Sequence, residues 1–100
     1  MDPGIPEFMT ADVVVSTAGR DQGKLYYVLS YEDPYLILIN GKSRTLDRPK
    51  RKKHKHVQKV LRSKTRVADK LRSADKVLNS ELRRDLAYLS QHMQSNNLGG

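Results

Sequence analysis

The sequence of 100 residues contains no cysteine. Disulfide frameworks, thiol nucleophiles and thiolate zinc sites are therefore excluded. No apolar run approaches the roughly 20 residues that a helix needs to span a bilayer, and the N-terminal residues lack the basic and apolar stretches of a signal peptide. These absences predict a cytoplasmic protein that has no membrane partner.

The residue groupings that enzymes use are also scarce. Ser16 and Thr17 have no evident general base nearby, and the glycines of 19–23 do not complete the Gly-x-x-x-x-Gly-Lys-Ser/Thr pattern of a phosphate-binding loop. Lysines flank two of the three histidines, which opposes binding of a metal cation; the histidines are His54, His56 and His92. We therefore expect a non-enzymatic protein with no metal, no cofactor and no small-molecule substrate.

Acidic residues are few relative to basic ones. The chain has 19 Lys and Arg against 11 Asp and Glu, for a net charge of +8, and such an excess predicts a polyanionic partner. Residues 1–8 are rich in Pro and Gly and precede a second methionine, Met9, so they look like a leader derived from a cloning vector. We exclude them from the expected fold. The remaining length supports one compact domain with at most an appendage.

Residues 12–46 have the texture of short strands separated by turns. Apolar and aromatic runs at 13–15, 25–29 and 35–39 alternate with a glycine-bearing loop at 18–24 and a Glu-Asp-Pro turn at 32–34. Asn40 and Gly41 are the pair best suited to a type I′ hairpin, so a fourth strand is expected at 43–46. Because successive residues of a strand face opposite ways, either Tyr26 or Tyr27 should lie in the core.

The composition changes at Arg48. Residues 48–68 include ten Lys or Arg and no acid, so like-charge repulsion should keep this segment from collapsing on itself. We expect an exposed basic arm at 48–56 and a fifth short strand near 56–61 that closes a β-barrel. The arm carries six Lys or Arg within 48–55, a density that matches a polyphosphate. An isolated run of this kind is equally compatible with a solvated loop or a nuclear-localisation patch.

Two further features bear on that choice. Positively charged residues on both sides of the arm suggest a basic surface and not a single basic spot; they are Lys42, Arg44, Lys59, Arg62, Lys64 and Arg66. Exposed tyrosines could also stack on RNA bases, although we favour packing in the core for each of them; these are Tyr26, Tyr27, Tyr31 and Tyr35.

The C-terminal third has a helical period. Apolar residues recur every three or four positions: Val67, Leu71, Ala74, Leu78, Leu82, Leu86, Leu89 and Met93. Asn79 and Ser80 are suitable N-caps, which predicts two helices joined there. The leucines should dock these helices on the barrel or on each other; the alternative is a groove for a partner. Residues 96–100 should be a disordered tail.

Three stretches of the sequence resemble a known family. VVVSTAGRDQGK (13–24) followed by Val28 resembles the KOW motif, the first hairpin of a small SH3-like barrel in ribosomal proteins and transcription elongation factors. NGKSRTL (40–46) and RPKRKKHKHVQ (48–58) are similar to the barrel of the large-subunit ribosomal protein fourteen-e family of archaea and eukaryotes, and to short bacterial proteins like it. The likeness covers about 12–61, and 78–89 is similar to the terminal helix of the family.

The resemblance implies contact with RNA through the KOW loop, here Arg20 and Lys24, and through the basic segment 50–56. The expected fold is mainly β with C-terminal α: an SH3-like (KOW) β-barrel of about five strands at 9–61, including the arm 48–56, then one or two short helices within 62–95. The candidate RNA contacts are Arg20, Lys24, Lys42, Arg44, Arg48, Lys50, Arg51, Lys52, Lys53, His54, Lys55 and His56.

The predicted function is binding of ribosomal RNA of the large subunit, or of a ribosome-associated complex, by recognition of RNA shape. The alternative is a KOW protein-interaction module that binds ribosomal or other proteins of the transcription and translation machinery. A third possibility, non-specific DNA binding, ranks last because no helix has a basic N-terminal turn suited to a DNA groove.

Overall fold

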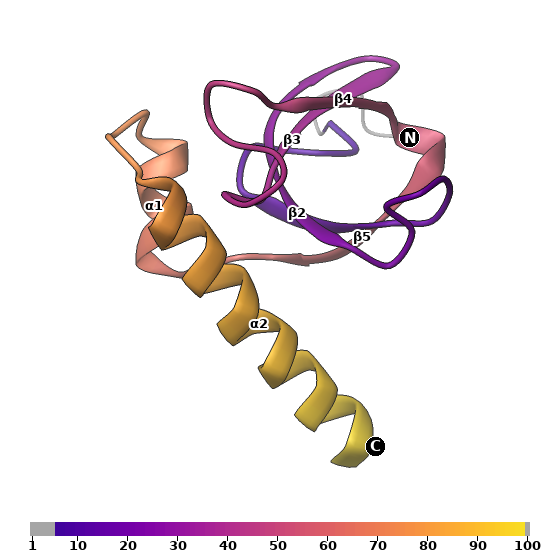
Figure 1. The fold of residues 1–100 in the computed structure, drawn as a ribbon, viewed down its shortest axis with the longest axis vertical. Helices are drawn as coiled ribbons and strands as arrows, with labels where there is room; N and C mark the ends of the chain where they lie inside the picture. Colours follow the sequence, from indigo (N-terminus) through magenta and orange to yellow (C-terminus); the bar gives the residue numbers. More distant parts are fainter. Residues whose placement is uncertain (1–5, 100) are drawn as a thin grey trace.

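A computed structural model describes residues 6–99, with side chains to Met93. The strands are β1 (Asp12–Ser16), β2 (Leu25–Glu32), β3 (Tyr35–Ile39), β4 (Lys50–Lys53) and β5 (Val57–Arg62); the helices are the short 3-10 helix η1 (His54–His56), α1 (Arg66–Arg72) and α2 (Asn79–Gly99). The strands form one antiparallel sheet in the order β4-β3-β2-β1-β5 (Figure 1). The predicted mainly β chain with C-terminal helices is confirmed.

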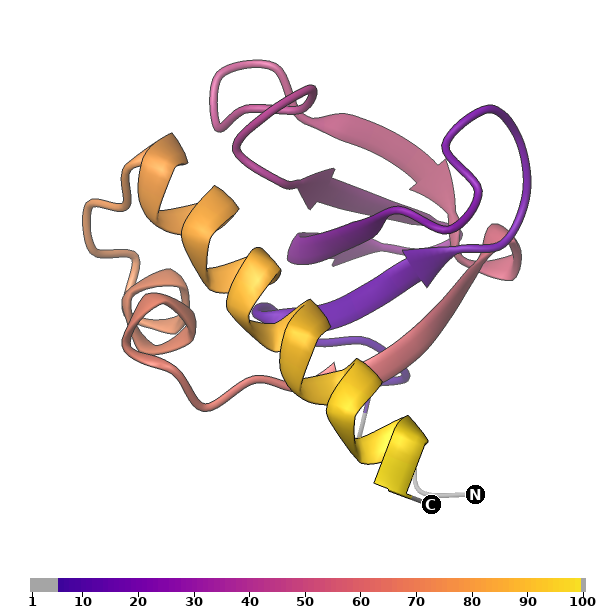
Figure 2. The ribbon, with the colours of Figure 1, turned by 60° about the horizontal axis from the view of Figure 1, so that its bottom comes forward.

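The sheet is strongly curved, as Figures 1 and 2 show. Its two edge strands, β4 and β5, are separated in the chain only by η1. Three residues span about 10 Å at most, so the two edges must approach each other at that end. A backbone hydrogen bond of 2.9 Å from Thr17 to the His56 carbonyl ties η1 to the loop after β1.

The expected strand at 43–46 is wrong. These residues belong to a loop, 40–49, in which Thr45 and Arg48 form one isolated bridge. The Asn40 side chain accepts hydrogen bonds from the Lys42 and Arg44 backbone amides, both at 2.9 Å, and so closes a compact turn. Only Gly41 of the Asn-Gly pair has a positive φ, of 76°, whereas a type I′ hairpin needs both. The strand that pairs with β3 is therefore β4.

Both faces of the sheet are buried. On one face Tyr26 packs with Val14, Val28, Leu36, Leu38, Val57 and Phe8; on the other Tyr27 packs with Val13 and Ile39 beneath the helices. Tyr26 and Tyr27 are each at most 1% exposed. The expectation that these two tyrosines pack in the core is confirmed, and both can be buried because the curved sheet encloses one apolar cluster while the helices cover a second.

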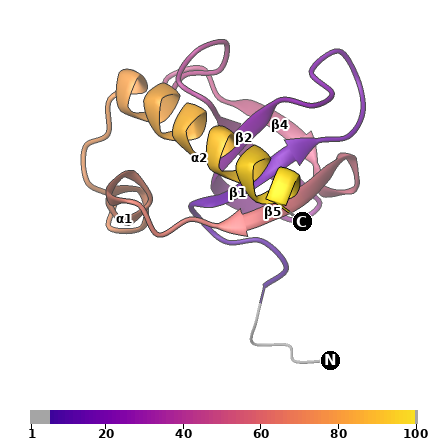
Figure 3. The same ribbon diagram turned by 90° about the horizontal axis from the view of Figure 1, so that it is seen from below.

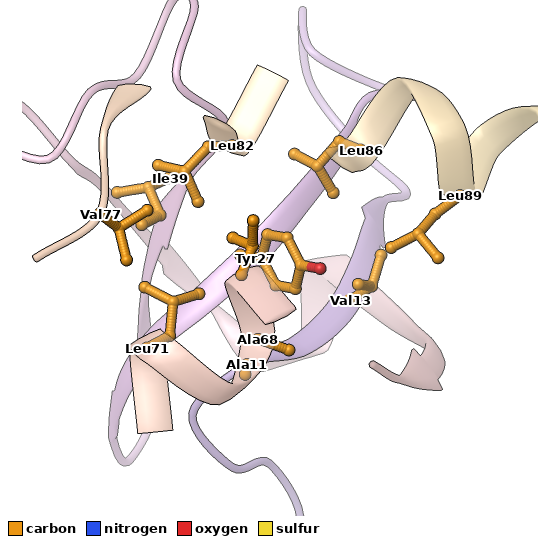
Figure 4. Close-up of a cluster of buried hydrophobic side chains, with 11 residues drawn as sticks. Ala11, Val13, Tyr27, Ile39, Ala68, Leu71, Val77, Leu82, Leu86 and Leu89 are labelled. Atoms are coloured by element: carbon orange, nitrogen blue, oxygen red, sulfur yellow. The ribbon is translucent and has the colours of Figure 1, made fainter. Parts of the chain in front are cut away.

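Helix α2 crosses the sheet on the Tyr27 face, and α1 lies beside it (Figures 2 and 3). The leucines of α2 point at the sheet, as Figure 4 shows, and Leu71 and Ala68 of α1 complete the cluster; the α2 residues are Leu82, Leu86 and Leu89. The prediction that the helical leucines dock on the sheet is confirmed for these positions. Leu78 is the exception, since it precedes α2 and is 53% exposed.

A polar network lies within the interface between helices and sheet. The Tyr27 hydroxyl donates to the Asp85 carboxylate and lies 2.9 Å from the Ser63 hydroxyl. Thr65 donates to the same carboxylate oxygen at 2.8 Å. Burial, together with the hydrogen bond to Asp85, raises the pKa of Tyr27 to about 12. The phenol therefore stays neutral and fixes α2 over β2.

Side chains define where each helix begins. The Thr65 hydroxyl caps α1 by accepting from the Ala68 amide at 3.2 Å. At the start of α2, the Glu81 carboxylate accepts from the Leu78 amide at 2.9 Å, which is half of a capping box. The joint between two helices is therefore where the sequence predicted it. Asn79 does not cap its own helix: its side chain accepts from the Leu46 amide at 3.1 Å and so attaches loop 40–49 to α2.

Both ends of the chain are described only in part. Residues 1–5 of the suspected leader lie outside the described residues, but Phe8 is 4% exposed and belongs to the core, so leaving it out of the expected fold was wrong. A vector origin for 1–8 stays a prediction. Disorder of 96–100 also stays one, because Gly100 and the side chains beyond Met93 are outside the described part. No helix among the described residues is long and apolar enough to cross a membrane.

Gly41 is the residue whose replacement should disturb this arrangement most simply. A Cβ there would lie 2.2 Å from the Asn79 carbonyl oxygen and 2.9 Å from Leu82 Cβ, at a φ that L-residues avoid. Gly23 has a similar φ of 90° with nothing within 4 Å, so it isolates the effect of backbone strain. We expect Gly23→Ala to lower the free energy of unfolding by about 1 kcal/mol and Gly41→Ala by roughly 3 kcal/mol, since overpacking adds to strain.

Urea titration of both variants measures the difference. Equal losses would show that loop 40–49 does not need to approach α2 this closely.

Candidate nucleic-acid interface

The expected basic arm is not a free arm, and this corrects the prediction for 48–56. Its residues 50–53 form β4, which pairs with β3 along its whole length. Alternation along the strand therefore divides its cations. Lys50 and Lys52 are half-buried and turn toward a carboxylate, whereas Arg51 and Lys53 are exposed.

That carboxylate belongs to Asp21, which is 8% exposed. Asp21 Oδ1 accepts from Lys52 Nζ and from the Ser16 hydroxyl, each at 2.9 Å. Its Oδ2 accepts from the Tyr26 hydroxyl at 3.0 Å and lies 3.5 Å from Lys50 Nζ. The four partners come from β1, β2 and β4, so one side chain joins three strands to the loop after β1.

Two opposing effects act on the pKa of Asp21. Burial raises it, but the hydrogen bonds from Lys52, Ser16 and Tyr26 and the charge of Lys50 together outweigh burial, so the pKa lies well below its ordinary value. Asp21 is therefore ionised, and burial, with the hydrogen bond to Asp21, raises the pKa of Tyr26 to about 12. The group is a closed charge cluster that holds Lys50 and Lys52 in place.

The glycine loop, 17–24, is held by this cluster and by its own backbone. The Gly23 amide donates to the Ser16 carbonyl at 2.8 Å, and the Ser16 amide donates to the Lys24 carbonyl at 3.0 Å. Gly19 and Gly23 supply the positive φ values that the reversal needs. Asp21 points inward while Arg20 and Lys24 are exposed, so the loop presents two cations from a fixed base.

A hollow of about 250 Å³ opens beside this loop, and we call it the first hollow. Four of the predicted cations line it: Arg20, Lys24, Arg44 and Lys50, together with Asp21, Tyr26 and Ser43. They come from the glycine loop, from loop 40–49 and from β4. Its one acid, Asp21, is already bound to lysines, so the hollow presents positive charge.

A second hollow of about 660 Å³ adjoins the first and shares Lys24 and Ser43 with it. It lies between loop 40–49 and α2 and is lined by Lys24, Leu25, Asn40, Lys42, Ser43, Arg83, Leu86 and Ala87. Arg83 Nη1 donates to the Gly41 carbonyl at 2.7 Å, which fixes its guanidinium at the edge of the hollow. We call the two hollows together the basic groove.

Sequence reasoning missed Arg83. In the sequence it is one charge of an Arg-Arg-Asp run on an amphipathic helix, where solvated charges are ordinary. The available signal was its position beside Leu82 and one turn before Ala87, at the border of the apolar face. Only the approach of loop 40–49 to α2 makes that border part of a site.

The remaining candidates lie elsewhere and do not line the basic groove. Arg51 lies over the Tyr35 ring, 3.7 Å from its centroid. His54 packs near Tyr31 and Phe8, with Nε2 3.7 Å from Asp33 Oδ1. Arg48, Lys53 and Lys55 are exposed, and His56 is half-buried.

Two cations expected to extend the basic surface are instead paired internally. Lys59 Nζ lies 3.4 Å and Arg62 Nε 3.3 Å from the fully buried Asp12 carboxylate. With Lys50 and Lys52, four cations of the segment 48–68 are thus paired internally, and they share two carboxylates, Asp21 and Asp12. The expectation that this segment keeps its charges unpaired was wrong for these four, because the buried carboxylates of Asp12 on β1 and Asp21 in the glycine loop attract the nearest lysines and arginine.

No cluster of three or more His, Asp or Glu side chains within the described residues is placed to hold a metal ion. No protein-family model matches the sequence, and no curated protein matches it either.

The Asp21 cluster predicts how stability depends on pH. A carboxyl group whose pKa is lower in the folded than in the unfolded state stabilises the fold. This contribution is complete at pH values above the ordinary pKa of 3.8 and is lost as the pH falls toward the pKa of the folded state. Asp21→Asn should lower the free energy of unfolding at pH 7 by roughly 3 kcal/mol, since it removes the carboxylate that Lys50 and Lys52 share. It should also flatten the fall in stability below about pH 5.

Denaturant titrations from pH 7 to pH 3 test this, with Asp75→Asn, at an exposed aspartate between α1 and α2, as the matched control. An acid profile that Asp21→Asn leaves unchanged would contradict the proposed role of the cluster.

Proposed function

We propose that the protein is a non-enzymatic RNA-binding module that grips the phosphates of folded RNA through the basic groove. One observation carries the proposal. Arg20, Lys24, Lys42 and Arg44 gather there from two loops, and none of them has a carboxylate within ion-pair distance among the described residues. Of the cations that pair with buried carboxylates, Lys50 lines the first hollow, and Lys52, Lys59 and Arg62 line neither hollow.

The physical basis is release of counterions. Each phosphate that a Lys or Arg neutralises frees condensed cations into solution, and their entropy drives binding. Cations held on a fixed surface also lose less conformational freedom on binding than those of a flexible arm. The glycine loop is anchored through Asp21 and loop 40–49 through Asn40 and Asn79, so this surface is ordered before RNA arrives.

The proposal also covers the protein family and the identity of the target RNA. The glycine loop that resembles the KOW motif joins the first two strands of a five-stranded antiparallel sheet, and its cations lead into the groove. This arrangement is compatible with an SH3-like barrel and with the resemblance to the ribosomal protein fourteen-e family. We therefore propose ribosomal RNA of the large subunit, or a ribosome-associated complex, as the target, recognised by shape.

Salt dependence tests the groove directly. The triple variant Arg20→Ala, Lys24→Ala, Lys42→Ala removes three cations of the groove, and Lys64→Ala, Arg66→Ala, Lys76→Ala removes three exposed cations outside it. With structured large-subunit RNA fragments, the slope of log K against log salt should flatten by roughly 2 in the groove variant, since each lost contact contributes about 0.7 to 0.9. The control variant should keep the slope of the parent protein.

Equal flattening in both variants would mean diffuse attraction and no defined site. If duplex DNA binds as tightly as the RNA at the same salt concentration, the ligand is nucleic acid in general and not RNA in particular. A pull-down after nuclease treatment addresses the protein-interaction alternative: partners retained without RNA favour that alternative, and loss of all partners favours RNA binding.

A further inference from the structure

The second hollow differs from the first in chemistry. Leu86 is 6% exposed and Leu25 is half-buried, whereas Lys24, Lys42 and Arg83 are exposed. Leu86 and Leu25 therefore lie deeper than the three cations, and Ala87 lies at the exposed edge. No carboxylate lines this hollow. Its volume of about 660 Å³ falls within the roughly 300–1,000 Å³ of typical small-ligand sites.

We propose that this hollow receives one unpaired nucleotide, turned out of a bulge or loop of the bound RNA. The inference rests on the proposed function and names the part of the RNA that enters. A flipped nucleotide offers a flat, weakly polar base and flanking phosphates, which match an apolar interior with cations at its edge. An ordinary base pair offers no free base face, so paired RNA cannot use the hollow.

Arg83 gives the hollow a planar surface. Its hydrogen bond to the Gly41 carbonyl uses Nη1, and a guanidinium has five N–H donors in one plane. Arginine planes stack on unpaired bases in RNA recognition. Nη1 has a fixed partner before the ligand arrives, because Gly41 is packed against Asn79 and Leu82 at the start of α2.

The cations of the hollow fit the phosphates of that nucleotide. Lys24 lines both hollows, so it stands where a strand leaving the second hollow enters the first. Lys42 lies across from α2 in loop 40–49, whose backbone Asn40 fixes. The Asn40 side chain holds its own loop, with Oδ1 accepting from two amides and Nδ2 donating one N–H to Ser43.

The test compares two RNA hairpins that are each closed by the same non-nucleotide linker and carry equal numbers of phosphates, one fully paired and one with a single bulged 2-aminopurine. Anisotropy at matched salt measures affinity, and 2-aminopurine emission reports whether the bulged base changes environment. We expect the parent protein to bind the bulged hairpin on the order of tenfold more tightly, the scale of one stacked base, with a change in emission.

Two variants locate the effect. Arg83→Gln removes the guanidinium plane, and the uncharged Ala87→Leu narrows the hollow; both should abolish the preference for the bulged hairpin. Arg84→Gln is the matched control, since it makes the same change at the next residue of α2, which lines a different hollow with Glu81 and Tyr88. It should keep the preference and the emission change.

The outcomes separate this inference from the proposed function. If the parent protein binds both hairpins equally, the inference fails while RNA binding stands. If it binds neither, RNA binding itself fails. A preference that survives both Arg83→Gln and Ala87→Leu places the bulged base elsewhere and overturns the inference. A Glu- and Leu-rich peptide tests an acidic protein partner as the occupant. If the parent protein binds both hairpins equally, and the peptide binds at Leu86 without displacing either hairpin, the hollow belongs to an acidic protein partner and the inference is overturned.

Discussion

The buried carboxylate of Asp21 organises the positive side of this molecule. It receives hydrogen bonds from Ser16, Tyr26 and Lys52 and attracts Lys50, so residues from three strands and one loop converge on a single charge. A buried charge without partners is very unfavourable, and with all its partners present it specifies one arrangement. Every element that contributes a cation to the first hollow is either part of this cluster or packed beside it.

The same cluster explains why so basic a chain folds compactly. The cations of β4 alternate: Lys50 and Lys52 turn inward and meet Asp21, while Arg51 and Lys53 turn outward and are exposed. Asp12 does the same for Lys59 and Arg62 on β5. The repulsion expected along 48–68 is thus partly relieved internally, while Lys53, Lys55, Lys64 and Arg66 of the same segment stay exposed.

The second part of the site depends on how the helices meet the sheet. Tyr27 and Asp85 fix α2 over β2, and Asn79 and Gly41 bring loop 40–49 against the first turn of α2. These contacts place Arg83 opposite Lys42 and create an apolar hollow with positive edges. The hollow is therefore a product of packing between segments about forty residues apart.

The sequence by itself determined the mainly β fold with C-terminal helices, the helix joint at Asn79 and the excess of positive charge, because periodicity, turn residues and charge are local properties. It placed Arg20 and Lys24 on a glycine loop for the same reason. Only the tertiary structure decided that the basic arm is a strand, that both Tyr26 and Tyr27 are buried, and that Arg83 joins the site. These outcomes depend on the curvature of the sheet and on ion pairs between carboxylates and lysines that lie far apart in the sequence. The residues next to them in the sequence therefore do not predict these contacts.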